Sequence, residues 1–330
     1  MTNALPVASV SFDLDNVWSF LKTHGDPSWE SRPSYLKTAT PRIVEFLGEM
    51  NLRSTVFVIG ADAARDDGAE SVRAFAAAGH EIGNHSYEHE PWLQRYHADE
   101  LAAEIDRTHS AIVAAGAPAP TGFRGPGYST SPTLERLLVE RGYTYDASTF
   151  PTWIGPLARA HHLRTAQLSA EQREERADLF GGVDRALLPL RPHRTPSGIA
   201  ELPVTTMPLL RLPIHGSYLM QLYSLSPRVA RLYFATAVRL CRGAPRRHDD
   251  AVAPHRPARP PRRAGTRLLP RHGRTGPREV RVHAVGGGDD AAPLHRARNP
   301  GPRHPRARGG RYPCAGGVTP GGAGRCPPHR

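Results

Sequence analysis

Two short segments of the chain combine carboxylates and imidazoles at spacings that suit a metal centre. Asp13 and Asp15 stand two residues apart at the end of an apolar run, so in a strand both side chains point to the same face. His85 and His89 stand four apart after another apolar run, and on one helical turn they would share a side. Two neutral imidazoles and one carboxylate form the three-ligand, open-coordination set of catalytic zinc. Together the segments predict a catalytic metal site, although each alone is also typical of a polar turn or of surface histidines.

Two further segments place polar side chains at the ends of predicted strands. Residues 122–128 read GFRGPGY, which sets Arg124 before a Gly/Pro turn whose free N–H groups can point into a cleft. Residues 145–151 read YDASTFP and end a strand with Asp146. Taken alone, the first is typical of a tight turn with an exposed arginine, and the second of a turn closed by an aspartate side chain.

Several other classes of site and protein are excluded. Ser86 stands where the H-E-x-x-H protease motif has its glutamate, and Thr130 stands at the third glycine position of G-x-G-x-x-G. The three cysteines, at 241, 314 and 326, form no C-x-x-C pair, which argues against a disulfide framework and a thiolate zinc site. No apolar run approaches the roughly 18 residues of a membrane span, and the N-terminus has no basic or long apolar leader segment. These features predict a cytoplasmic protein without a membrane partner.

The elements that must position these residues alternate along the first 150 residues. Short apolar runs alternate with helical patterns, which is typical of β/α units around a parallel sheet. Strands are predicted at 7–12, 55–59, 81–84 and 122–124. Helices are predicted from the cap Thr40 and first residue Pro41 onward, at 70–78, at 99–115, and from Ser131-Pro132 to the stop at Gly142. Four such units favour a barrel or an open doubly wound sheet.

The pattern changes after residue 150. Residues 153–197 are charged and contain proline, which predicts an insertion over the mouth of the barrel; a strand at 202–206 and a helix at 227–241 follow. The four tryptophans could stack on sugar rings, but core packing is the commoner role; they are Trp18, Trp29, Trp92 and Trp153.

The positive charge of the chain is confined to its last part. Residues 243–330 hold 19 Arg, no Lys and five acidic residues, a net +14, whereas residues 1–242 hold 24 basic and 26 acidic residues, a net −2. The overall +12 therefore says little about the folded part. Without lysine, and with Tyr312 as its single aromatic residue, the tail argues against a nucleic-acid partner, and the sequence sets no oligomeric state.

The four polar segments, each at a strand end and in chain order, resemble the polysaccharide deacetylase family, the NodB homology or carbohydrate esterase 4 group. The resemblance covers residues 7 to about 240 and implies an α/β fold, a distorted (β/α)7 barrel. The usual first motif of the family is T-F-D-D-G, whereas residues 12–16 read FDLDN. That form is closer to a branch with peptidoglycan deacetylase-like and allantoinase-like members, in which the second aspartate binds the metal.

The resemblance implies a site that binds a divalent metal, with zinc as the first choice, through Asp15, His85 and His89. It also implies hydrolysis of a C–N bond other than a peptide bond, with removal of an acetyl group from an N-acetylated sugar or polysaccharide as the first choice. Two alternatives remain open. One is an allantoinase-like or cyclic-imide amidohydrolase acting on a small amide, and the other is an inactive barrel with an Arg-rich nucleic-acid-binding tail.

Four catalytic roles follow from the same resemblance. Asp13 would be the general base that takes a proton from the attacking water, and Arg124 would keep it ionised and oriented. The backbone N–H of Tyr128 would stabilise the tetrahedral oxyanion, and Asp146 would orient the general acid.

The chain departs from the family pattern after Cys241. A Leu-x-His-Pro-like segment that supplies the general acid should follow there, and it is absent. Residues 243–330 are instead dominated by Arg, Pro, Gly and Ala, a mixture that a GC-rich gene gives when it is read out of frame. Reading the codons of 251–264 one base later permits PSLL(T/I)DPLDLLGGP, which resembles a barrel strand and loop. We therefore predict a frameshift that leaves the barrel of residues 1–242 incomplete at its C-terminus; the alternative is a genuine, disordered basic tail.

Overall fold

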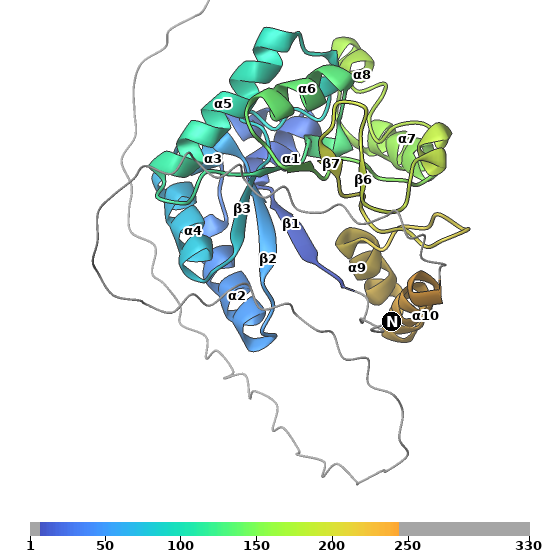
Figure 1. The fold of residues 1–330 in the computed structure, drawn as a ribbon. Coiled ribbons are helices and arrows are strands. Elements are labelled where there is room, and N and C mark those ends of the chain that lie inside the picture. The colour runs from blue at the N-terminus through green and yellow to red at the C-terminus, as the bar shows by residue number, and fades with distance from the viewer. Residues whose placement is uncertain (1–6, 244–330) are drawn as a thin grey trace, which may run out of the picture. The chain divides into compact units, whose positions relative to one another are not determined.

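The computed structural model describes residues 7–243 (Figure 1). All of the predicted basic tail except Gly243 lies outside the described residues, so the frameshift stays a prediction. The predicted division between a barrel at 1–242 and a separate tail also stays a prediction. No helix in the described part of the chain has the length and apolar character needed to cross a membrane.

A seven-stranded sheet forms the centre of the described residues. Its strands, in spatial order, are β1 (Val10–Leu14), β2 (Ser54–Val58), β3 (Glu81–Asn84), β4 (Gly122–Phe123), β5 (Tyr145–Asp146), β7 (Ala200–Glu201) and β6 (His193–Arg194). All neighbours are parallel except β6 and β7. The first five strands follow chain order without the reversal of a doubly wound sheet. The predicted α/β class with a parallel sheet is confirmed, and among the described residues no pairing joins β1 to β6.

Ten α-helices are described around this sheet. They are α1 (Val17–Thr23), α2 (Leu36–Glu49), α3 (Gly60–Ala63), α4 (Asp66–Ala77), α5 (Ala98–Ala114), α6 (Pro132–Glu140), α7 (Gly155–Thr165), α8 (Ala170–Glu175), α9 (Gly216–Leu225) and α10 (Pro227–Gly243). Short 3-10 turns are η1 (Pro27–Ser31), η2 (Leu93–Arg95), η3 (Pro126–Tyr128) and η4 (Val183–Leu187). In Figure 1, α2 and α4 lie beside β2 and β3, and α9 and α10 lie side by side near β1.

The largest buried cluster joins helices α2 and α4 to the first three strands. Leu36 and Phe75 contribute from the helices, and Val56, Val58 and Ile82 contribute from the strands. Near-continuous apolar runs such as STVFV are typical of parallel strands that are covered on both faces. This packing fixes the strands whose ends carry the polar residues.

Two predicted element boundaries are wrong near the N-terminus. The first strand runs from Val10 to Leu14, not over 7–12, so Asp13 lies inside the strand. Helix α2 begins at Leu36, and Pro41 lies inside it. Thr40 does not cap the helix, because it also lies inside it; its hydroxyl donates to the hydroxyl of Ser71 on α4 at 2.8 Å. The predicted cap at Ser131 is confirmed, since its side chain accepts from the N–H of Leu134.

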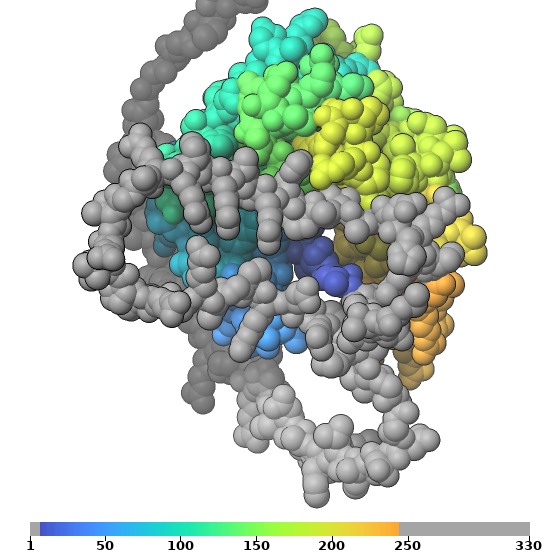
Figure 2. Space-filling view, viewed as in Figure 1, coloured from blue at the N-terminus to red at the C-terminus, as the bar shows by residue number. Residues whose placement is uncertain are grey.

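The second half of the chain is more ordered than its composition indicates. The predicted insertion at 153–197 holds α7, α8, η4 and β6. In place of the strand predicted at 202–206, the structure has the two-residue β7, Ala200–Glu201, and an isolated bridge between Thr206 and Pro213. Helix α9 was not predicted at all. In Figure 2 the green surface of α6 meets the yellow surface of the β6–β7 hairpin, where the Ser197 hydroxyl donates to Glu135 at 2.8 Å.

Gly83 gives a direct test of how tightly β2 and β3 pack. A Cβ at this position would lie 2.4 Å from the ring of Phe57, its register partner. We expect Gly83→Ala to lower the free energy of unfolding by about 1–3 kcal/mol in denaturant titrations, because overpacking forces the ring or the strand to move. Gly48→Ala is the matched control, since nothing lies within 4 Å of a Cβ there and alanine favours helix α2. Equal effects of the two substitutions would contradict the packing account.

Candidate active site

Parallel strands bring the polar residues to one edge of the sheet. Asp13 pairs in register with Phe57, Asn84 with Phe123, and Phe123 with Asp146. The residues that follow these strands are therefore neighbours, although they are far apart in the chain. This is how the fold collects the segments singled out in the sequence.

Asp15, His85 and His89 form a compact group of ligand atoms. The Oδ1 atom of Asp15 lies 3.0 Å from Nε2 of His89 and 3.4 Å from Nε2 of His85, and the three ligand atoms all lie within 4.8 Å of one another. The predicted helical turn is wrong, because the segment after β3 is irregular. Positive φ angles of 58° at Ser86 and 55° at His89 shape the loop that brings the two rings together.

The surroundings of this group fit a metal ion. The Nδ1 atom of His85 lies 2.6 Å from the backbone oxygen of Arg124, so the N–H there donates to that oxygen and leaves the Nε2 lone pair facing Asp15. The Asp15 side chain is 47% exposed, but its Oδ1 atom is buried and has no hydrogen-bond partner in the described part of the chain. Burial would raise the pKa of Asp15, but His89 and His85 lower it, so the carboxylate is ionised. A buried anionic oxygen facing two imidazole nitrogens is a donor set for a divalent cation.

Asp13 and Arg124 form an ion pair beside this group. The Nη1 atom of Arg124 lies 2.8 Å from Oδ1 of Asp13, and Oδ2 of Asp13 lies 3.9 Å from Nε2 of His85. Arg124 is only 7% exposed, and its Nη2 and Nε atoms donate to Ser11 Oγ and to the carbonyl oxygen of Ala147. A guanidinium held at three points can orient one carboxylate and keep it charged.

The structure places the predicted oxyanion donor differently. The backbone N–H of Tyr128 donates to the carbonyl oxygen of Gly125 at 2.9 Å and closes the turn η3. It is therefore committed inside the protein and is not directed at a substrate. Tyr128 has a φ of 62°, and this conformation positions its side chain.

Asp146 was predicted to orient the general acid. Among the described residues it contacts no histidine, so no contact supports that role. It is fully buried, accepts hydrogen bonds from Ser148 and Thr130, and pairs in register with Glu201. Burial is the main cause that raises the pKa of both carboxyl groups, and Asp146 raises that of Glu201 further. The pair is a buried polar support for the strand ends β5 and β7.

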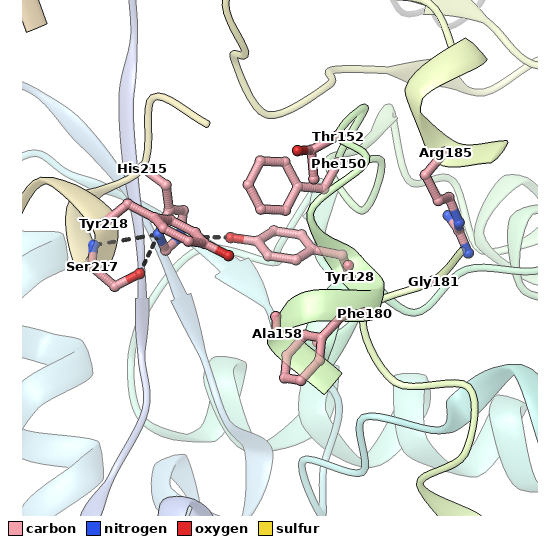
Figure 3. A pocket seen from close by; sticks show the side chains of 12 residues that line it. Tyr128, Phe150, Thr152, Ala158, Phe180, Gly181, Arg185, His215, Ser217 and Tyr218 are labelled. Atoms are coloured by element: carbon pink, nitrogen blue, oxygen red, sulfur yellow. Dashed lines mark hydrogen bonds between the residues drawn. The ribbon is translucent and has the colours of Figure 1, made fainter. Parts of the chain in front are cut away.

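Sequence reasoning missed His215, which precedes helix α9. Its Nε2 atom lies 2.8 Å from the hydroxyl of Tyr128, and both residues line a pocket of about 130 Å³ (Figure 3). The pocket is walled by aromatic rings and by residues of the insertion; they include Phe150, Phe180, Arg185 and Tyr218. In the sequence, His215 stands out only as a histidine after the short apolar run LPI. Because helix α9 was not predicted, nothing marked His215 as a residue at the start of a helix.

The tryptophans are divided between core and surface. Trp18 is fully buried and its Nε1 donates to Oδ1 of Asp62 at 2.8 Å, as expected for a core residue. Trp153 is 41% exposed at the start of the insertion, and its Nε1 donates to the carbonyl oxygen of Leu210.

Comparison with known sequences identifies the family. A sequence model of the polysaccharide deacetylase family matches residues 26–145. This part of the chain is therefore similar to the polysaccharide deacetylase family. It contains both histidines and Arg124, while Asp13 and Asp15 precede it.

Two curated relatives are similar to parts of this chain. A peptidoglycan-N-acetylglucosamine deacetylase of Bacillus cereus is 33% identical over 87 residues, 26% of this chain and 30% of that protein. A peptidoglycan deacetylase of Helicobacter pylori is 27% identical over 143 residues, 41% of this chain and 47% of that protein. The matches thus span less than half the length of either relative.

A solved structure from Mycobacterium smegmatis, described as a polysaccharide deacetylase, is also similar to this chain. It is 21% identical with a TM-score of 0.44, and the match covers 70% of this chain and 78% of that one.

The Asp15, His85 and His89 group can be tested by metal titration. We expect His89→Ala to lower zinc affinity at least about 10-fold in calorimetric titrations of the full chain, because one of three ligands is lost. His161→Ala, at an exposed histidine on α7, is the control and should leave the affinity unchanged. Unchanged zinc binding in His89→Ala would contradict the ligand set.

The buried carboxyl pair predicts a pH dependence of stability. A pKa raised in the folded state stabilises the protein below the unfolded pKa, and this contribution is lost as the pH rises toward the folded value. For Glu201 the window runs from about 4.5 to about 9. We expect the free energy of unfolding to fall by more than about 1.4 kcal/mol between pH 6 and pH 9, the equivalent of one unit of pKa shift.

Glu201→Gln should remove much of that fall, because the amide oxygen can still accept from the N–H of Thr149 and carries no charge. Glu49→Gln, at an exposed position on α2, is the control for general charge effects. A Glu201→Gln protein with the same pH dependence as the unmodified protein would show that the pair does not titrate in this range.

Proposed function

We propose that this chain is a zinc-dependent deacetylase that removes acetyl groups from N-acetylated sugars of a polysaccharide. The observation that supports this most is the placement of the Asp13–Arg124 ion pair beside the Asp15, His85 and His89 group. A ligand set next to a held carboxylate suits hydrolysis of an amide by water. The two curated relatives, by their names, deacetylate peptidoglycan, which supports the choice of substrate.

In this proposal each residue has one task. Asp15, His85 and His89 hold the zinc ion, which when bound supplies Lewis acidity for the acetyl carbonyl and the attacking water. Asp13 takes a proton from that water. Arg124 fixes the orientation of the Asp13 carboxylate through the 2.8 Å contact.

The aromatic pocket beside Tyr128 offers a place for the sugar. Rings that face a cavity of this kind bury the apolar face of a ligand, and polar groups at the rim fix its orientation. The insertion supplies part of the wall, through Gly155 and Ala158 of α7, and Phe180. The predicted cytoplasmic location stays a prediction, and it would direct the enzyme to soluble oligosaccharides.

The proposal predicts a specific effect of Asp13→Asn. We expect zinc affinity within about threefold of the unmodified chain, because Asp13 is not a ligand, and a fall in acetate release of about 100-fold or more, the usual contribution of a general base. Acetate is measured from N-acetylglucosamine oligomers with the zinc-loaded full chain. Asp99→Asn, on the exposed first turn of α5, is the control.

Two results would contradict the proposal in different ways. Acetate release at an unchanged rate in Asp13→Asn would place the base elsewhere. Ring-opened product from a cyclic imide, with no acetate from the oligomers, would favour the allantoinase-like alternative.

A further inference from the structure

The side chains of Tyr128 and His215 form a hydrogen-bonded pair at one end of the pocket (Figure 3). His215 precedes helix α9 and caps it: its Nδ1 atom accepts from the backbone N–H of Ser217 at 3.3 Å and lies 2.7 Å from the hydroxyl of Ser217. The ring of Tyr128 packs on Phe150 at 4.8 Å between centroids. The pair thus joins η3, which follows Arg124, to the start of α9.

The cap determines which nitrogen of His215 carries the proton. A backbone N–H can only donate, so Nδ1 must be the acceptor, and the neutral ring then carries its proton on Nε2. That Nε2–H donates to the oxygen of Tyr128. Because the Tyr128 oxygen accepts from His215, its own O–H is free to donate to another group.

We propose that the Tyr128 hydroxyl, oriented by His215, donates a hydrogen bond to the acyl oxygen of the substrate as negative charge develops there. This inference rests on the proposed deacetylase function and goes beyond it, because it moves the oxyanion contact from the backbone of Tyr128 to its side chain. The backbone N–H of Tyr128 already donates to the carbonyl oxygen of Gly125, so the side-chain hydroxyl acts as the oxyanion donor instead. Tyr128 is then the catalytic residue and His215 a positioning residue.

The electrostatics of the pair agree with this role. Burial is the main cause that raises the pKa of Tyr128, and Asp13 and Asp15 raise it further, so the hydroxyl keeps its proton at neutral pH. Burial also lowers the pKa of His215; Asp13 raises it and Arg124 lowers it, so the ring is neutral. The pair is linked to the Asp13–Arg124 ion pair through the chain, because Tyr128 ends η3, which starts two residues after Arg124. A neutral imidazole held at a helix N-terminus is a known way to present a hydrogen-bond donor without a net charge.

The reaction balances without a redox step or a further reactant. The water oxygen bonds to the acyl carbon, and one water proton goes to Asp13. Charge builds on the acyl oxygen, where the Tyr128 hydroxyl donates a hydrogen bond and keeps its proton. The C–N bond then breaks, its electron pair stays on nitrogen, and nitrogen takes a proton from solvent. The amine and acetic acid leave, acetic acid loses its proton to solvent to become acetate, and Asp13 returns its proton to solvent, so that one proton is released in all.

Tyr128→Phe tests the hydroxyl while keeping the ring on Phe150. We expect kcat to fall about 100-fold with KM and zinc affinity unchanged, the size found when one oxyanion donor is removed. The fall should be equal for an N-acetylglucosamine oligomer and for 4-nitrophenyl acetate, because both form the same oxyanion. Tyr223→Phe, at an exposed tyrosine on α9, is the matched control. A wild-type kcat in Tyr128→Phe, or a loss confined to the amide, would overturn the inference.

His215→Asn tests the positioning role, because asparagine is a good helix cap but is too short to reach Tyr128. We expect a fall in kcat of about 10-fold in the unmodified background and no further fall in the Tyr128→Phe background. If the two substitutions instead lowered kcat independently, so that their effects multiplied in the double variant, His215 would act on the substrate itself. That result would overturn the proposed positioning of Tyr128 by His215. No turnover of either substrate by the zinc-loaded chain would contradict the proposed function itself.

A measurement that needs no turnover tests the Tyr128–His215 inference separately from the proposed deacetylase function. In the metal-free full chain labelled with 15N-histidine, the imidazole signal that disappears in His215→Asn should show a protonated Nε2 and a bare Nδ1 at pH 7.5. A ring protonated on Nδ1 alone, or on both nitrogens, would overturn the proposed positioning of Tyr128 by His215, whatever the activity of the enzyme.

Discussion

The site depends on one buried guanidinium. Arg124 donates to Asp13, to Ser11 on the same strand and to the carbonyl oxygen of Ala147 after β5, while its own carbonyl oxygen accepts from His85. A single residue therefore ties the ends of β1, β3 and β5 and fixes both Asp13, the proposed base, and His85, one of the three proposed metal ligands. Burying a cation costs free energy unless its donors are paired with acceptors. These hydrogen bonds therefore fix the position of the Arg124 guanidinium. The register of the sheet places the strand ends close enough for these contacts to form.

The sequence predicts the strand ends well and the loops that follow them poorly. Arg124 directly follows β4 and Asp146 ends β5, as predicted, because parallel β/α units leave little choice of where such residues lie, whereas Asp13 lies inside a strand that extends two residues further than predicted. The loop after β3 was not predictable, because two residues with side chains adopt positive φ there. The use of the Tyr128 N–H inside η3 is likewise a property of the folded turn, and no spacing in the chain encodes it.

His215 shows a different limit of sequence reasoning. It lies 87 residues from Tyr128 in the chain, and the contact exists only because α9 begins beside the pocket. Residues 153–197, which lie between them, were predicted as an insertion over the mouth of the barrel without any helix, and they supply α7 and one wall of the pocket. Charged, proline-containing segments give weak periodic signals even where they fold, since few of their side chains are buried. The functional part of such an insertion becomes visible only when its neighbours are known.

The central claim is that Asp15, His85 and His89 hold a metal ion beside Asp13. Anomalous diffraction at the zinc edge, from crystals of the full chain grown with zinc, tests it most directly. The account predicts one strong peak about 2.0–2.2 Å from Oδ1 of Asp15 and from Nε2 of each histidine, with Asp13 outside the coordination shell. A peak elsewhere with none at this position, or direct coordination by Asp13 in place of Asp15, would contradict it.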